Sequence, residues 1–389
     1  MRNLMRLASA RGERGVIGVL FGALVGGAVL LGMAAMVVDV GSIYAERAQL
    51  QNGADAGALA VAKGCAEGTA DCSDSTASDG TAGRYANRNA KDAASAVDLV
   101  CGSDTEGVLE ACPSSTGAMT DCPDAPTDGV NYVDVHTSTR TSDGGTLLPS
   151  SFAHALAGNA DYDGTTVGAC ARAAWGAPES GDGLALTISW CEWDEATAGG
   201  DDYAPPPPEA ADASYERVLH FHQNASENPD DSESCTAEPS GADIPGGFGW
   251  TDPEEDSCTT DFNYDDENST TYDADPGNTA SDDPDCVAAL EKAWTERTPV
   301  MIPVYEETPE GGGNNGQYTL HEPAAFVVTG YYLGGQVKKT VWLPGSPLYG
   351  QYPCGGSDRC LSGYFTTATT SGDPGSSPGS GVTAARLTG

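Results

Sequence analysis

A single uninterrupted apolar run stands near the start of the chain. Residues 16–38 contain no charged side chain, and at the rise of an α-helix they span roughly 35 Å, enough to cross the hydrocarbon core of a bilayer. The segment before them is basic. Its arginines are Arg2, Arg6, Arg11 and Arg14. Because basic flanks stay on the cytoplasmic side, the pattern predicts a single-pass membrane helix with residues 1–15 in the cytoplasm and the C-terminal region outside the cell.

A cleaved secretory signal is the alternative interpretation of the same run. The run is longer than a usual signal core, and no small-x-small cleavage site lies at its end. Ala54-Asp55-Ala56 comes late and is a poor substitute. The sequence therefore favours an anchor that stays in the membrane.

Helical periodicity continues beyond the apolar run. Apolar residues recur near helical spacing from Val40 to Val61, and no proline occurs before Pro113. We therefore expect one helix that leaves the membrane and ends near Gly64. Inside the apolar run, three glycines follow one another at four-residue intervals: Gly18, Gly22 and Gly26. Such a strip lets another helix approach closely in lipid, although glycine is also common in membrane helices without this role.

The rest of the chain shows mainly the patterning of β-strands. Residues 64–129 are rich in small and polar side chains, with one helical candidate at 82–96. Later runs alternate between apolar and polar residues and are separated by turn residues, which predicts strands. The expected strands are residues 130–140, 165–175, 184–190, 216–223, 300–304, 318–320, 325–333, 337–343 and 361–367, with a short helix at 286–294 and a last apolar-tinged segment at 382–387. A long helix followed by antiparallel strands is an α+β arrangement.

The prolines at 205–208 suggest how the exported region is divided. They stand inside an acidic stretch and predict a stiff linker over residues 205–214. A first part, residues 39–204, then holds the outer helix and antiparallel strands, and residues 215–389 form a second, β-rich part. A long acidic, glycine-rich insertion covers residues 224–285.

The net charge of the chain limits the classes of partner that it can bind. It carries 57 acidic and 18 basic side chains, a net charge of −39. Four arginines and one glutamate precede residue 39, so the remainder carries −42. Such a surface repels polyanions, which excludes nucleic acid as a partner of this region.

All twelve cysteines follow the apolar run. An even number in an exported region with only 7% aromatic residues indicates disulfides that compensate for a thin core. The chain has no C-x-x-C pair, which disfavours zinc ribbons and thioredoxin-like sites. Two short polar loops predict the bridges Cys65–Cys72 and Cys354–Cys360, while the other pairings stay open. The other cysteines lie at positions 101, 112, 122, 170, 191, 235, 258 and 286.

The candidate catalytic and metal-binding motifs are weak. His220 and His222 share one face of an expected strand, but no third ligand lies at a known spacing. Residues 261–272 resemble a calcium loop without its central glycine or final glutamate. Residues 375–379 match G-x-S-x-G, but no histidine follows them. We therefore predict no catalytic residue, cofactor or organised metal site, and the acidic loops could associate loosely with cations.

The segment around the apolar run resembles a known family. The residues that carry the resemblance are Glu13-Arg14-Gly15 before the run and Val38–Gly41, Tyr44, Arg47, Gln49–Asn52, Ala54–Ala56 and Ala58–Ala60 after it. This string resembles the TadE/TadG-like proteins of Flp (tight-adherence) pilus assembly. Segments at 171–175, 186–191, 245–250, 303–305, 324–331 and 354–364 are similar to the long, cysteine-bearing members of high-GC Gram-positive bacteria.

The resemblance implies a pilin-like, single-pass component that meets the lipid bilayer and other pilus-assembly membrane proteins. Members processed by the prepilin peptidase carry a glutamate five residues after a glycine cleavage point. Here Leu20 stands five residues after Gly15, so a TadG-like role without processing fits better. We expect a non-enzymatic component of pilus assembly. The alternative is a membrane-tethered surface-binding or adhesion module that acts independently of pili.

Overall fold

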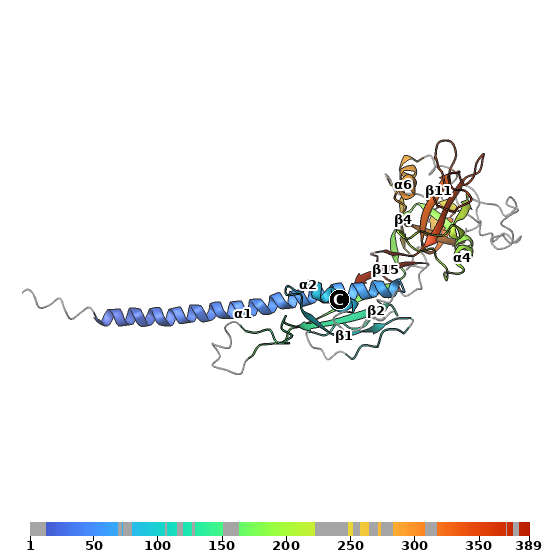
Figure 1. The fold of residues 1–389 in the computed structure, drawn as a ribbon. Helices are drawn as coiled ribbons and strands as arrows, with labels where there is room; N and C mark the ends of the chain where they lie inside the picture. Colours follow the sequence, from blue (N-terminus) through green and yellow to red (C-terminus); the bar gives the residue numbers. More distant parts are fainter. Residues whose placement is uncertain are drawn as a thin grey trace, which may run out of the picture.

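The computed structural model describes residues 13–68, 72, 80–105, 107–114, 120–126, 129–150, 163–221, 248–251, 257–263, 271–273, 283–307, 317–370, 372–375 and 381–389. Figure 1 shows three parts in sequence: a helical rod, a sheet packed against the far end of that rod, and a head beyond the sheet. We call the outer half of the rod, with its sheet, the proximal domain. The expected α+β arrangement is confirmed.

Helix α1 (Glu13–Ala66) forms the rod without a break. Its 54 residues give a length of about 81 Å at 1.5 Å per residue. Large apolar side chains are exposed along its first half, whereas Leu50, Ala54, Ala58 and Val61 are buried on one face of its second half. This spacing of four, four and three residues puts a narrow apolar stripe against the sheet.

The proximal domain is a five-stranded sheet covered by two helices. Its strand order is β1-β2-β3-β15-β14, antiparallel except for the β14–β15 pair. The elements are α2 (Thr81–Asn89), β1 (Ser95–Ser103), β2 (Asn131–Thr139), β3 (Gly168–Gly176), β14 (Ala368–Thr370) and β15 (Val382–Leu387). Alanines and valines from α1, α2, β2 and β3 fill the space between helices and sheet.

Glycines bring α1 and α2 unusually close. A Cβ atom added at Gly53 would lie 3.1 Å from the Cα of Ala86, and one at Gly57 would lie 3.3 Å from the Cα of Ala82. Larger side chains at these two positions would push α2 away. The four-residue spacing of small residues on α1 is therefore what lets α2 dock.

The head is built on an eight-stranded sheet. Six strands follow the order β6-β13-β11-β10-β5-β7, while β9 and β12 pair with β11; β4 and β8 form a separate pair. The strands are β4 (Ser180–Leu184), β5 (Leu186–Ser189), β6 (Arg217–His220), β7 (Phe248–Trp250), β8 (Thr259–Asn263), β9 (Thr271–Asp273), β10 (Val300–Glu307), β11 (Gln317–Tyr332), β12 (Lys338–Lys339) and β13 (Cys360–Thr366). The helices are α4 (Trp190–Thr197), η2 (Ala213–Tyr215) and α6 (Pro284–Glu296). Its main core contains aromatic and aliphatic side chains from the sheet, α4 and α6.

The chain passes between the two sheets at positions other than the expected linker at 205–214. Strand β5 already belongs to the head, and β14 and β15 return to the proximal sheet. The prolines at 205–208 follow a residue bound to β13, because Ala204 donates its N–H to Phe365 (3.1 Å) and accepts from the Thr366 hydroxyl (2.8 Å). Sheet membership depends on hydrogen bonds between distant segments, which local composition does not reveal.

Several elements also differ in extent from their sequence expectation. The helical candidate at 82–96 splits into α2 and the start of β1, and only Lys338–Lys339 of 337–343 is strand. The pieces expected at 318–320 and 325–333 are one strand, β11. Pro323 lies within this strand, opposite Pro303 of β10 and close to a shift in the ladder. Proline has no backbone N–H to donate to a ladder. Because both residues of this pair are prolines, neither strand presents an N–H here that lacks an acceptor.

Candidate functional site

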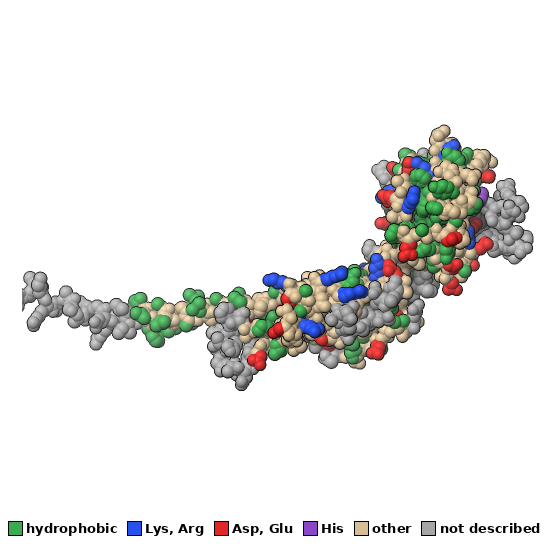
Figure 2. All heavy atoms as spheres, viewed as in Figure 1, with side chains coloured by type: hydrophobic (Ala, Val, Ile, Leu, Met, Phe, Trp, Pro, Cys, Tyr) green, Lys and Arg blue, Asp and Glu red, His purple; other side chains and the backbone are tan. Residues whose placement is uncertain are grey.

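The free half of α1 is the first candidate site. Val19, Leu30 and Leu31 expose 70% or more of their surface, and Figure 2 shows hydrophobic side chains along the described part of this half of the rod. Among the described residues this is the one helix long and apolar enough to cross a membrane. Because water would hydrate this apolar surface unfavourably, lipid or another helix must cover it.

The expected packing residues lie on this free segment. Gly18, Gly22 and Gly26 each have open space where a Cβ atom would stand. They contrast with Gly53 and Gly57, whose space is closed by α2.

Residues just beyond the membrane segment dock α1 on the sheet. The amide of Gln51 donates to the carbonyl of Cys170 (2.9 Å), and the Thr137 hydroxyl donates to the carbonyl of Leu50 (3.0 Å). Gln49 accepts from the N–H of Lys91 at 2.7 Å. The glutamine-containing string at 49–52 therefore attaches the rod to the proximal domain.

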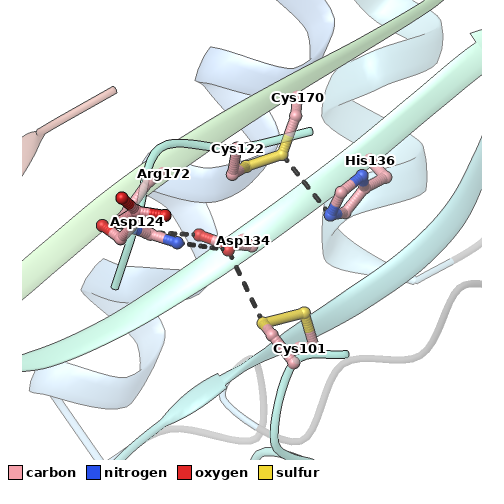
Figure 3. Close-up of polar contacts among 8 residues, drawn as sticks. Cys101, Cys122, Asp124, Asp134, His136, Cys170 and Arg172 are labelled. Carbon is pink, nitrogen blue, oxygen red and sulfur yellow. Dashed lines mark hydrogen bonds and ion pairs between the residues drawn. A yellow bond between two sulfur atoms is a disulfide. The ribbon is translucent and has the colours of Figure 1, made fainter. Parts of the chain in front are cut away.

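A buried ion pair in the proximal sheet is the second candidate. Asp134 on β2 lies directly opposite Arg172 on β3. The Nε and Nη2 of Arg172 donate to the two carboxylate oxygens, each at 2.6 Å, and the side chains are 5% and 3% exposed. The guanidinium also donates to the carbonyl of Asp124 and lies 4.6 Å from the centre of the Tyr132 ring. Figure 3 shows Arg172 beside both Asp134 and Asp124.

Two disulfides flank the ion pair, as Figure 3 shows. They are Cys101–Cys112 and Cys122–Cys170. A sulfur of the first lies 3.6 Å from the Asp134 carboxylate, and Cys170 lies 3.5 Å from Nε2 of His136. His136 forms two groups whose ligand atoms are close enough to surround a metal ion, one with Cys122 and Cys170 and one with Cys101 and Asp134. However, cysteine binds metal as a thiolate, and all four sulfurs are bonded to each other in pairs. The cluster therefore cross-links β1, β2, β3 and the segment at 122–124.

A cleft of about 410 Å³ borders this cluster and contains Arg172 and Arg386. Arg172 is bound to Asp134, and Arg386 is ion-paired with Asp373. The cations of this cleft are thus already neutralised. Its chemistry is that of a structural contact between β3, β15 and the segment at 373–374.

The remaining residues singled out from the sequence are dispersed. Cys65 is bonded to Cys72 at the outer end of α1, and Cys354 to Cys360 at the start of β13. These are the two local bridges expected above, and Cys258–Cys286 joins the residue before β8 to α6. Cys191 is also disulfide-bonded.

The weak motifs do not assemble into a site among the described residues. His220 ends β6, while His222 lies outside the described residues. Of the calcium-like segment at 261–272, residues 264–270 lie outside them, as do residues 376–379 of the G-x-S-x-G match. Sequence reasoning missed Asp134 and Arg172, because only the register of β2 against β3 reveals that they meet.

Comparison with known proteins bears on the first candidate. Residues 15–64 match the Tad family model, which describes TadE/G-like proteins of Flp pilus assembly. No curated protein and no solved structure matches the chain. The matched residues include the apolar half of α1, its open glycines and the string that docks it on the sheet. Residues 15–64 are therefore similar to the TadE/G-like proteins of Flp pilus assembly, and they lie in the one described helix that is long and apolar enough to cross a membrane.

Proposed function

We propose that this protein is a non-enzymatic, TadG-like membrane anchor that holds an extracellular head at a site of Flp pilus assembly. The observation that carries the proposal is the continuity of α1. One helix runs from an exposed apolar segment into the core of the proximal domain. The position of the proximal domain, to which the head is attached, is therefore linked directly to that of the apolar segment.

The apolar segment is sufficient to hold the helix in lipid. Twelve of the residues at 16–38 are Leu, Ile, Val or Phe, each favourable by about 0.3–0.6 kcal/mol near the bilayer centre, which gives about 4–7 kcal/mol in total. The arginines before the run keep the N-terminus in the cytoplasm. The disulfides support the same orientation, because they persist in oxidising compartments.

The glycine strip supports a packing role in the membrane. Gly53 and Gly57 show that α1 admits a neighbouring helix through small residues four positions apart. Gly18, Gly22 and Gly26 repeat that spacing with open space around them. A helix of another pilus-assembly membrane protein fits this face, since close backbone approach is what stabilises helix pairs in lipid.

Cross-linking in cells tests the packing role. Gly22→Leu fills the strip, and we expect it to reduce cross-linking to other pilus components while the protein stays in the membrane. Ala28→Leu adds apolar bulk on a different face of the helix and serves as the matched control. Unchanged cross-linking of Gly22→Leu would refute the packing role.

Protease treatment of intact cells tests the orientation. We expect the head to be digested from outside, leaving a membrane-bound fragment that contains α1. Full protection of the head in intact cells, with digestion only after lysis, would place it on the cytoplasmic side and contradict the proposal.

A further inference from the structure

The head contains an apolar cleft that the anchor role does not use. It has a volume of about 650 Å³ and opens between residues 207–211 and 342–344. Leu343 and Tyr364, each 2% exposed, lie at its base beside Trp342. Pro207, Pro208, Ala210, Ala211 and Pro344 complete its apolar lining.

Hydrogen bonds and stacking hold the walls of this cleft in place. Ala204 is bonded through its N–H and its carbonyl to β13, which fixes the start of the proline segment. The indole N–H of Trp342 donates to the carbonyl of Val328 at 3.0 Å. Arg297 lies over the Trp342 ring at 4.4 Å from its centre. A ligand would therefore enter a preformed cleft and order few side chains, which lowers the entropic cost of binding.

The rim of the cleft carries two exposed glutamates, Glu209 and Glu296, and one exposed cation, Arg297, whose guanidinium is stacked on the Trp342 ring. Neither carboxylate has a hydrogen bond or ion pair with another described residue. They lie in a region of the chain with a net charge of −42. A field of that sign raises the local concentration of cationic groups and repels anionic ones.

The lining also discriminates between classes of ligand. Apart from its charged residues, the cleft has one exposed side chain with a hydroxyl group, Thr298. Away from the charged rim, a sugar would leave its hydroxyls without partners on the proline, alanine and leucine lining, which is costly. Apolar side chains have no hydrogen bonds to lose in such a cleft. Its prolines and aromatic rings offer them a rigid contact surface.

We infer that this cleft binds an extended peptide segment of another protein, in which lysine or arginine stands beside apolar residues. The apolar side chains enter the cleft, and the basic ones pair with Glu209 and Glu296. A second copy of this chain is disfavoured because its net charge of −39 would repel the first. The inference concerns the head alone and does not depend on packing in the membrane.

Fluorescence anisotropy with the full-length protein in zwitterionic lipid nanodiscs tests this inference, with empty nanodiscs as the blank. The probe is a labelled nine-residue peptide that alternates lysine, leucine and proline. We expect saturable binding that weakens as salt is raised, because the rim pairs are exposed and screened. The double variant Glu209→Lys/Glu296→Lys should weaken binding by about tenfold or more, the effect of reversing two charges at a contact.

Two further variants separate a local site from the general field. Asp98→Lys/Glu110→Lys makes the same change in net charge at exposed positions of the proximal domain, and it should alter binding by less than about twofold. Ala210→Trp fills the cleft from an exposed position and should abolish binding without changing the unfolding temperature. Equal weakening by the proximal control, full binding by Ala210→Trp, or equally tight binding of a glutamate-substituted probe would each overturn the inference.

Discussion

The ion pair between Asp134 and Arg172 gives the sharpest test of how the proximal domain is stabilised. Replacing Asp134 by alanine leaves the guanidinium of Arg172 buried without its counter-charge, with the Asp124 carbonyl and the Tyr132 ring as its other contacts. Because both partners are at least 95% buried, we expect a loss of about 3–5 kcal/mol. For a unit of 150–250 residues this lowers the unfolding temperature by roughly 6–20 °C.

The double variant Asp134→Leu/Arg172→Met isolates the cause. It removes both charges and keeps apolar bulk, so most of the lost stability should return. The measurement is thermal unfolding followed by circular dichroism in nanodiscs. Glu291→Ala is the control, because it breaks the exposed ion pair between Glu291 and Lys339. Their side chains are 53% and 29% exposed, so the variant should lower the free energy of unfolding by at most about 1 kcal/mol. A double variant as unstable as Asp134→Ala would refute the reasoning, because uncompensated charge would then not be the source of the loss.

Three other changes test the membrane segment, the helix contact and an acidic strand pair. Leu24→Arg should disfavour insertion by about 3–4 kcal/mol, and more protein should leave membranes on alkaline extraction; an unchanged membrane fraction would contradict the anchor. Gly57→Leu forces α2 away and should lower stability by about 1–3 kcal/mol in the same unfolding assay, whereas Gly41→Leu, which has open space, should not. Asp182 faces Asp261 across β4 and β8, and their hydrogen bond and mutual repulsion raise the pKa of Asp182 above its ordinary 3.8. A raised pKa means that the pair is most stable below that ordinary value and loses stability as pH rises through the raised one. After correction for intrinsic rates, β8 amides should therefore exchange hydrogen more slowly at pH 4 than at pH 7, and Asp261→Asn should remove the difference; a variant that keeps it would show another cause.

The elements found correctly from sequence are those whose pattern is local. The apolar run and the apolar periodicity after it predict α1 almost to its observed end at Ala66. Helix α6 also begins at a local feature, since the Asp283 carboxylate accepts from the N–H groups of Asp285 and Cys286. Helix α4 was missed, although Ser189 and Glu192 match a capping box and Ser189 accepts from the Glu192 N–H.

The features that the sequence could not predict depend on contacts between distant segments. Strand β15 pairs with β3 about 200 residues earlier, and its short apolar-tinged sequence contains nothing that selects this partner. The same applies to Asp134 and Arg172. Each is one charge among many in the sequence, and only the pairing of their strands brings them together.

The return of β14 and β15 to the proximal sheet has a mechanical consequence. Two stretches of backbone join the head to the proximal sheet, one leaving β3 near residue 177 and one re-entering near residue 368. The first is covalently continuous with the rod, whereas the second is held to the sheet by the pairing of β14 with β15 and of β15 with β3. A tensile load on the head, such as drag from flowing liquid, is therefore shared between one covalent path and a set of strand hydrogen bonds that act in parallel with it.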